Sequence, residues 1–232
     1  MFRRLLRKLI PSYAIFPLVM TGIMNLIAYQ VAKLLQLFTG TARTIDMTTA
    51  FDRATPFLPI WVLMYIATFL FWIYQNTTVA KDSPEMAYRL VAADFVAKLI
   101  CLVCFVVIPT TNVRPTVEGS GFHIWLIKFI YWIDTPTNLF PSIHCFVAWL
   151  GTRMMFDCKH LSHKTVTSIL CVIGSLMVFL STLFTKQHVI YDVISGVLVA
   201  ELGYLVAKYT ALPRLFERIN TRFLKTKLSQ IL

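Results

Sequence analysis

Long apolar runs dominate this sequence, and they predict helices rather than strands because most of them extend well beyond ten residues. Six runs could each cross a membrane, at residues 12–38, 59–74, 88–108, 139–156, 166–184 and 189–209. A spanning helix needs roughly 20 mostly apolar residues, so the short second and fourth runs would extend into their flanks. The pattern predicts an all-α integral membrane protein with six transmembrane helices, in a single membrane domain over residues 1–232.

Some polar and short segments between or within these runs have a predicted structural role. Residues 122–133 are apolar and aromatic but too short to span, so we expect this segment to lie in the membrane interface. The first outer loop, about residues 39–58, shows no chemistry that outweighs a structural role. Within the third run, Asp94 and Lys98 are four residues apart and should neutralise each other on one helix face.

Composition supports the membrane assignment. The chain is 57% hydrophobic and 14% charged, with a mean hydropathy of +0.69, whereas a soluble domain usually carries about 25% charged residues. The basic N-terminal segment precedes an apolar run longer than a signal-peptide core, with no small-residue cleavage pattern, so we expect a retained first span. The five cysteines lie in or beside the runs, and we interpret them as small buried hydrophobic residues.

The positions of Lys and Arg predict the orientation of the chain. These residues concentrate near both chain ends and in the loops after the second and fourth runs, which places both termini in the cytoplasm. The net charge of +11 could suggest a nucleic-acid partner, but the charge lies at membrane edges, so no such partner is expected. The basic tail, about residues 208–232, is instead expected to meet anionic lipids.

A proline, a hydroxyl and an imidazole come together where the fourth run begins, at Pro141, Ser142 and His144. Proline is favoured in the first turn of a helix, and the N–H groups and dipole of that turn bind anions. A phosphate held there would lie within reach of His144, with Asn138 and Ser142 as candidate substrate-binding residues. Alone, the stretch is equally consistent with a proline-started helix that carries a surface serine and histidine.

Two further polar groups reach the same membrane face. Arg114 follows the third run between two prolines, in a stiff segment that suits a bidentate clamp on phosphate. His188 and Asp192 open the sixth run four residues apart, so the carboxylate can orient the imidazole and leave its other nitrogen nucleophilic. A structural His–Asp helix cap is the alternative. With six spans these groups and Lys186 all emerge at the extracytoplasmic surface, where together they predict a phosphate site.

The motif order Arg-Pro, then Pro-Ser-x-His, then Ser…His-x-x-x-Asp resembles the type 2 phosphatidic acid phosphatase superfamily of membrane enzymes. That group includes lipid phosphate phosphatases, undecaprenyl and dolichyl pyrophosphatases, and inositol phosphorylceramide and sphingomyelin synthases. The resemblance covers residues 93–207, about half of the chain. It implies a six-helix membrane fold with a vanadium-haloperoxidase-like phosphatase helical core, and a covalent phosphohistidine mechanism.

The resemblance also implies a role for each matched residue. His188 would be the nucleophile that becomes phosphorylated, with Asp192 as its orienting partner, and His144 would protonate the leaving alcohol. Arg114 would hold phosphate oxygens. The serines of the second and third motifs correspond to Ser142 and Ser181.

Two positions depart from the family pattern. Val107 stands where the first motif has Lys, and Thr182 stands where the third motif usually has Arg. Lys98 is a poor replacement because ten helical residues place it roughly 15 Å deeper in the bilayer. Lys186, two residues before His188, is the better candidate for the missing charge. The motifs of the phosphotransferase branch also diverge from those of the phosphatases, and the two departures seen here are similar to that divergence.

Three hypotheses about function remain. The leading one is a phosphatase acting on a lipid phosphate or isoprenoid pyrophosphate at the outer face, and the second is a transferase that moves a phosphate-linked headgroup between lipids. The third is a six-span transporter or structural protein in which the same residues bind an anion without turnover. The site has no dense carboxylate cluster, so no metal or other cofactor is expected.

Overall fold

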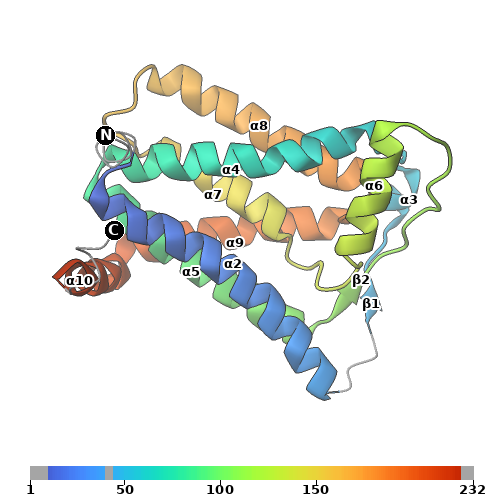
Figure 1. The fold of residues 1–232 in the computed structure, drawn as a ribbon, viewed down its shortest axis with the longest axis horizontal. Coiled ribbons are helices and arrows are strands. Elements are labelled where there is room, and N and C mark those ends of the chain that lie inside the picture. The colour runs from blue at the N-terminus through green and yellow to red at the C-terminus, as the bar shows by residue number, and fades with distance from the viewer. Residues whose placement is uncertain (1–9, 40–43, 226–232) are drawn as a thin grey trace.

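The computed structural model describes residues 10–39 and 44–225, and these residues are mainly helical. The elements are α2 (Ser12–Thr39), β1 (Ile45–Asp46), α3 (Ala50–Ala54), the 3-10 turn η1 (Pro59–Trp61), α4 (Val62–Asp82), α5 (Pro84–Val107), β2 (Thr110–Thr111), α6 (Phe122–Ile133), α7 (Ile143–Met155), α8 (Lys164–Phe184), α9 (Ile190–Tyr209) and α10 (Leu212–Lys225). The long helices run alongside one another as a bundle (Figure 1).

Among the described residues, five helices are long and apolar enough to cross a membrane: α2, α4, α5, α8 and α9. They confirm five of the six predicted spans. The second was predicted to end at residue 74, but α4 continues to Asp82. Its polar second half stays helical because the bundle accommodates it: Gln75 is fully buried, and the Thr77 hydroxyl donates to the Ile73 carbonyl within the helix.

The fourth predicted span is corrected by the structure. The helix begins at Ile143 rather than at residue 139 and has 13 residues, which is about 20 Å against the roughly 30 Å of a bilayer core. The preceding residues form an irregular loop instead. Irregular backbone is tolerated at membrane depth only where protein surrounds it, and both Leu139 and Ser142 are buried.

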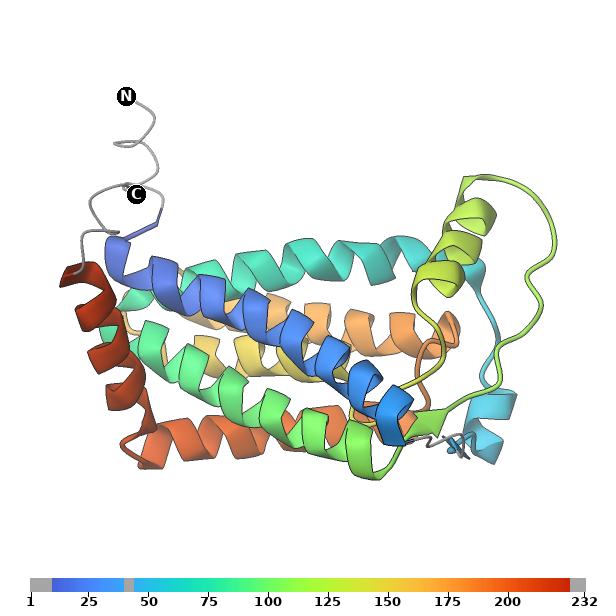
Figure 2. The same ribbon diagram turned by 60° about the horizontal axis from the view of Figure 1, so that its bottom comes forward.

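The bundle has two distinct ends. The start of α2 and the whole of α10 lie at one end, while α3, α6 and the two strands lie at the other (Figures 1 and 2). The strands form a small parallel pair in which Ile45 is opposite Thr110. The expectation of a short helix at residues 122–133 is confirmed by α6. The loops that carry the predicted site all belong to the end with the strands.

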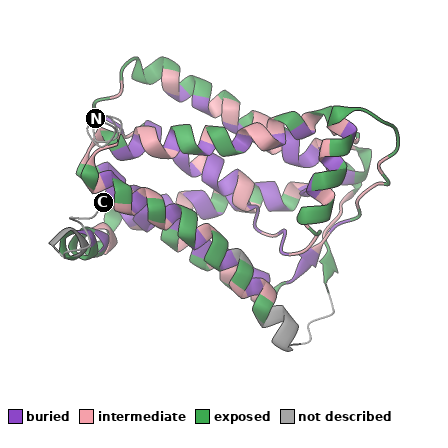
Figure 3. Cartoon of the chain, viewed as in Figure 1, coloured by how far each residue is buried: buried purple, intermediate pink, exposed green. Residues whose placement is uncertain are grey.

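Helix α5 lies at the centre of the bundle, against α2, α4, α9 and α10. Small residues let it approach α9 closely, since a Cβ at Gly203 would lie 2.5 Å from the Ala93 carbonyl oxygen. The exposed residues lie on the outward faces of the helices (Figure 3). Many of them are large and apolar, including Leu70 at 72% exposure and Val107 at 70%, as expected for a surface that meets lipid.

A buried ion pair within α5 also binds α2 through a hydrogen bond. The Lys98 Nζ lies 2.8 Å from Asp94 Oδ2 and also donates to the Thr21 carbonyl oxygen at 2.6 Å. This geometry confirms the predicted pairing of the two charges on one helix face. Because both side chains are almost fully buried, each charge depends on the other for its neutralisation.

Breaking this pair should destabilise the protein strongly. We expect Asp94→Ala to lower the free energy of unfolding by about 3–5 kcal/mol, because it leaves a buried ammonium unpaired. The double change Asp94→Leu with Lys98→Met should recover most of that loss. Thermal unfolding in detergent measures both. Glu85→Ala is the control, since it removes the exposed partner of Arg89 and should cost below about 1 kcal/mol; a similar loss from both single changes would contradict the account.

Candidate active site

The start of α7 is held directly against the start of α9. The Ser142 backbone N–H donates to the Asp192 carbonyl oxygen at 3.1 Å. Gly196, one turn further along α9, permits this approach, because a Cβ there would lie 2.8 Å from the Ser142 carbonyl oxygen. Two of the three predicted site elements, His144 and the His188–Asp192 pair, are therefore brought together by backbone packing.

His188 is oriented by Asp192 as the four-residue spacing predicted. The Asp192 Oδ2 lies 3.1 Å from His188 Nδ1 and also accepts the backbone N–H of Val189 at 3.0 Å. A carboxylate can only accept here, so Nδ1 carries the proton of the neutral imidazole. The Nε2 lone pair of His188 is then available as a nucleophile. Asp192 also caps the first turn of α9, so the structural and chemical interpretations of the pair are compatible.

His144 lies next to His188 inside a group of aromatic rings. The two imidazole centroids are 5.7 Å apart. Tyr65 and Trp72, both on α4, lie 4.7 and 5.3 Å from the His144 ring. Contacts on several sides fix the imidazole in one orientation, close enough to His188 for one small group to touch both rings.

Arg114 is fixed from three directions. Its NH1 donates to the Asp134 carbonyl oxygen at 2.5 Å, its NH2 donates to Gln187 Oε1 at 2.6 Å, and its guanidinium lies 4.6 Å from the Tyr131 ring centroid. Tyr131 is itself anchored by donating to the Thr185 carbonyl oxygen, and burial raises the pKa of its phenol although Arg114 opposes the shift. Arg114 is thus connected to the turn that carries His188.

Gln187 was not identified from the sequence, yet it joins Arg114 to the neighbour of His188. Its side chain is 1% exposed and its Nε2 has no hydrogen-bond partner among the described residues. The turn is held by the Thr182 carbonyl oxygen, which accepts the backbone N–H groups of Gln187 and His188. A glutamine beside a histidine is an uninformative pattern, and only the long-range contact with Arg114 reveals its role.

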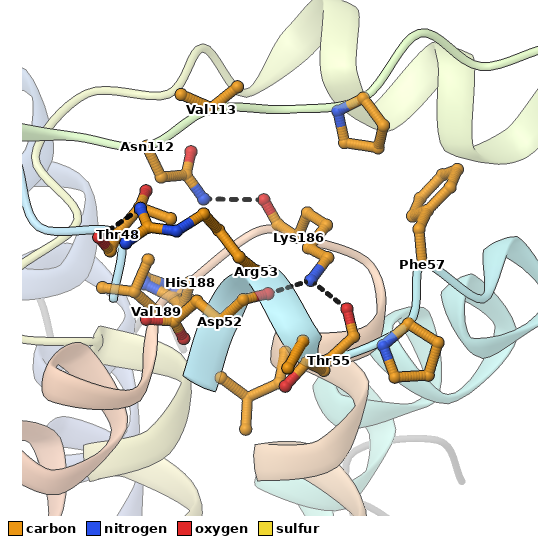
Figure 4. A pocket seen from close by; sticks show the side chains of 14 residues that line it. Thr48, Asp52, Arg53, Thr55, Phe57, Asn112, Val113, Lys186, His188 and Val189 are labelled. Carbon is orange, nitrogen blue, oxygen red and sulfur yellow. Dashed lines mark hydrogen bonds between the residues drawn. The ribbon is translucent and has the colours of Figure 1, made fainter. Parts of the chain in front are cut away.

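Lys186 lines an outer cavity together with His188, but its ammonium is directed to α3. Its Nζ donates to the Asp52 and Thr55 carbonyl oxygens at 2.6 and 2.5 Å (Figure 4). Burial lowers the pKa of Lys186, and the nearby Asp52 carboxylate partly offsets that shift. To bind phosphate in place of the missing arginine, as predicted, the Lys186 ammonium would have to give up these two hydrogen bonds.

The first outer loop is structural, as predicted, and it supports the site. Asp52 is 5% exposed, and its Oδ1 accepts the Ile190 backbone N–H at 2.8 Å. Its other oxygen completes a capping box with Thr49. Asp52 therefore caps two helices, α3 and α9, and places α3 over the turn that contains His188.

The remaining predicted residues have supporting positions in the structure. Ser142 is the N-cap of α7 and accepts the Cys145 backbone N–H. Asn138 is buried with a left-handed φ of 58°, a conformation that asparagine tolerates. Ser181 is buried in α8, where its hydroxyl donates to the Val178 carbonyl oxygen, and the structure does not direct it toward the histidines.

Two cavities meet at His188. The outer one has a volume of about 390 Å³ and is lined by α3, by the segment around Asn112, and by the turn with Lys186. The inner one, about 420 Å³, lies between α2, α4, α6 and α7 and contains His144 among mainly apolar and aromatic side chains. The outer cavity has the charged residues Asp52, Arg53 and Lys186 in its wall, whereas the inner one is more apolar and faces helices that could border lipid.

Asp192 should determine which nitrogen of His188 carries the proton. Nitrogen-15 NMR of histidine-labelled protein at alkaline pH should show a protonated Nδ1 and an unprotonated Nε2. Asp192→Ala should remove this preference, while Asp157→Ala, at the opposite end of the bundle, should preserve it. A protonated Nε2 in the unmodified protein would contradict the assignment.

Comparisons of this chain with known protein families, curated proteins and solved structures found no match. The resemblance to the phosphatase superfamily is therefore an expectation that depends on the motif order alone. Any chemical role of the site has to be inferred from the geometry of its side chains.

Proposed function

We propose that this protein is an integral-membrane phosphatase that hydrolyses a lipid phosphate or an isoprenoid pyrophosphate through a phosphohistidine on His188. The observation that carries the proposal is the pairing of an Asp192-oriented His188 with His144, whose ring centroid is 5.7 Å away. This arrangement supplies a nucleophile and an acid–base group on adjacent helix starts. Arg114, held by the Gln187 side chain next to His188 in sequence, supplies positive charge.

In the first step, His188 Nε2 attacks phosphorus and forms a P–N bond while the P–O bond to the leaving group breaks. His144, which takes up a proton together with the incoming phosphate anion, transfers that proton to the departing oxygen, which leaves as an alcohol or, from a pyrophosphate, as a lipid monophosphate. Asp192 stabilises the positive charge that develops on the His188 imidazole. Each group therefore has one role in a displacement that is in line at phosphorus.

In the second step, water takes the place of the leaving group opposite His188. His144, now neutral, accepts a proton from that water as its oxygen bonds to phosphorus and the P–N bond breaks. Inorganic phosphate and free His188 result, so atoms and protons balance over the cycle. The negative charge on the phosphoryl oxygens is stabilised by Arg114 and by first-turn N–H groups of α7 other than that of Cys145, which donates to Ser142.

The inner cavity supports a lipid substrate. Its walls include Leu26, Phe69 and Ile130 from three helices, together with His144. A leaving group protonated by His144 would occupy this apolar space, which suits a lipid alcohol better than a soluble one. The distribution of Lys and Arg supports the proposal that this end of the bundle is extracytoplasmic and that both termini are cytoplasmic, in a multi-pass protein of the cell membrane. We also propose membership of the type 2 phosphatidic acid phosphatase superfamily, on the motif order given above.

The outer cavity favours a second candidate, a lipid phosphotransferase. A phosphomonoester leaves only oxygens on the transferred phosphorus, whereas a phosphodiester leaves a headgroup that needs space. The cavity of about 390 Å³ beside His188 offers such space, with Asp52, Arg53 and Lys186 in its wall. Purified protein incubated with lipid phosphates and phosphodiesters, with and without acceptor lipid, separates the candidates. Phosphate release without acceptor supports the phosphatase, transfer only with acceptor supports the second candidate, and neither product contradicts both.

Removing either histidine should abolish turnover for different reasons. His188→Ala should lower kcat by roughly 10⁴-fold or more because no covalent intermediate can form, and His144→Ala should lower it by about 10²–10⁴-fold because the acid–base group is lost. Phosphate release in a coupled assay measures both effects. His123→Ala is a matched control in the first turn of α6, where the imidazole is half-buried. Near-normal turnover by His188→Ala would refute the proposed mechanism.

Gln187 should act by positioning Arg114. Gln187→Leu removes a charge-assisted hydrogen bond, so we expect kcat/KM to fall by about 10–100-fold. In an Arg114→Ala background, the same change should have little further effect, because the pair acts as one unit. Gln75→Leu provides a buried-glutamine control elsewhere in the bundle. Fully additive losses in the double-mutant cycle would show that Gln187 acts independently of Arg114.

A further inference from the structure

Helix α10 lies across the end of the bundle opposite the site. Figure 2 shows it turned away from the direction of the long helices, beyond the point where α9 ends. The turn is short, since α9 ends at Tyr209 and α10 begins at Leu212. If the bundle crosses a bilayer, a helix in this position lies at the membrane surface.

One stripe of α10 fixes the helix to the bundle. Phe216 is 6% exposed and packs edge-on against Phe95 of α5, with ring centroids 5.7 Å apart. Asn220, one turn later and 1% exposed, donates to the Tyr13 carbonyl oxygen and the Tyr88 hydroxyl. These contacts bind α10 to both α2 and α5, so the direction of its other faces is defined.

The faces of α10 that point away from the bundle differ in polarity. Leu215 and Ile219 form an apolar stripe that is 51% and 41% exposed. Beside it, Arg214, Arg218 and Arg222 recur every four residues and are all exposed. On a helix with 100° per residue, the apolar stripe lies between the buried stripe and the arginines.

We infer that α10 is a membrane-surface helix that binds the headgroups of anionic phospholipids through Arg214, Arg218 and Arg222. Leu215 and Ile219 then enter the boundary between headgroups and acyl chains, at the edge of the bundle. Charge complementarity selects this partner, because three guanidinium groups on one stripe match a surface of phosphates. The narrow apolar stripe of Leu215 and Ile219 also fits a membrane surface, since interfacial helices bury such a stripe only shallowly.

This surface is independent of the proposed catalytic function, because it lies at the other end of the molecule. It also sharpens the expectation for the basic tail by assigning the contact to one face of one helix.

Hydrogen exchange of the full-length protein in nanodiscs tests the inference. Discs of phosphatidylcholine alone are compared with discs that also contain phosphatidylglycerol, and exchange is followed in the peptide that covers residues 212–222. We expect exchange to be roughly tenfold slower or more in the anionic discs, because each basic residue near an anionic surface contributes favourably to the free energy of membrane binding. Raising the salt concentration to about 0.5 M should shrink the difference, since screening shortens the range of these interactions.

Substitutions identify the residues responsible. Arg214→Gln, Arg218→Gln and Arg222→Gln together should abolish the dependence on phosphatidylglycerol, while peptides of α5 and α9 confirm that the bundle remains folded. Lys159→Gln with Lys164→Gln is the matched control, because both residues are exposed near the start of α8 and should not affect α10. Equal exchange in the two kinds of disc, or a lipid dependence that survives the arginine substitutions, would overturn the inference.

Discussion

The site depends on one backbone contact, the hydrogen bond from the Ser142 N–H to the Asp192 carbonyl oxygen. It joins the starts of α7 and α9, and Gly196 allows the two segments to approach. The pairing of the two histidines follows from this contact. His144 belongs to the first turn of α7, and His188 lies two residues before α9, so fixing the two helix starts fixes the separation of the two imidazoles.

Local patterns made much of this structure predictable from the sequence. The four-residue spacing of His188 and Asp192, and of Asp94 and Lys98, requires only that the chain be helical or nearly so, and both pairs form. The long apolar runs likewise identified five helices. The length of α7 was mispredicted because hydropathy does not distinguish a helix from an apolar loop buried in protein.

Contacts between distant residues were not predictable in this way. Gln187 meets Arg114 across 73 positions, and Asp52 meets Ile190 across 138. Each depends on how the loops at one end of the bundle fold over one another, and a single sequence contains no local signal for that packing. For the same reason Lys186 was assigned to phosphate, whereas the structure shows its ammonium bonded to two carbonyl oxygens of the α3 segment.

The two ends of the molecule have different physical tasks. At the site end, His188 lies where a cavity with charged residues in its wall meets a more apolar one, so a phosphate and a lipid chain could each occupy a matching environment. At the other end, positive charge is presented on α10, away from any reaction. The proposed catalytic site and the proposed lipid-binding helix α10 therefore lie at opposite ends of the bundle, one helix length apart.

The most direct test of the central claim is to locate the phosphoryl group on the enzyme. Protein mixed with a radiolabelled lipid phosphate is quenched in base, which preserves phosphohistidine, and its peptides are then analysed by mass spectrometry. The account predicts a phosphoryl group on the peptide that contains His188, and specifically on its Nε2. A phosphoryl group on His144, or turnover without any phosphorylated histidine, would contradict it.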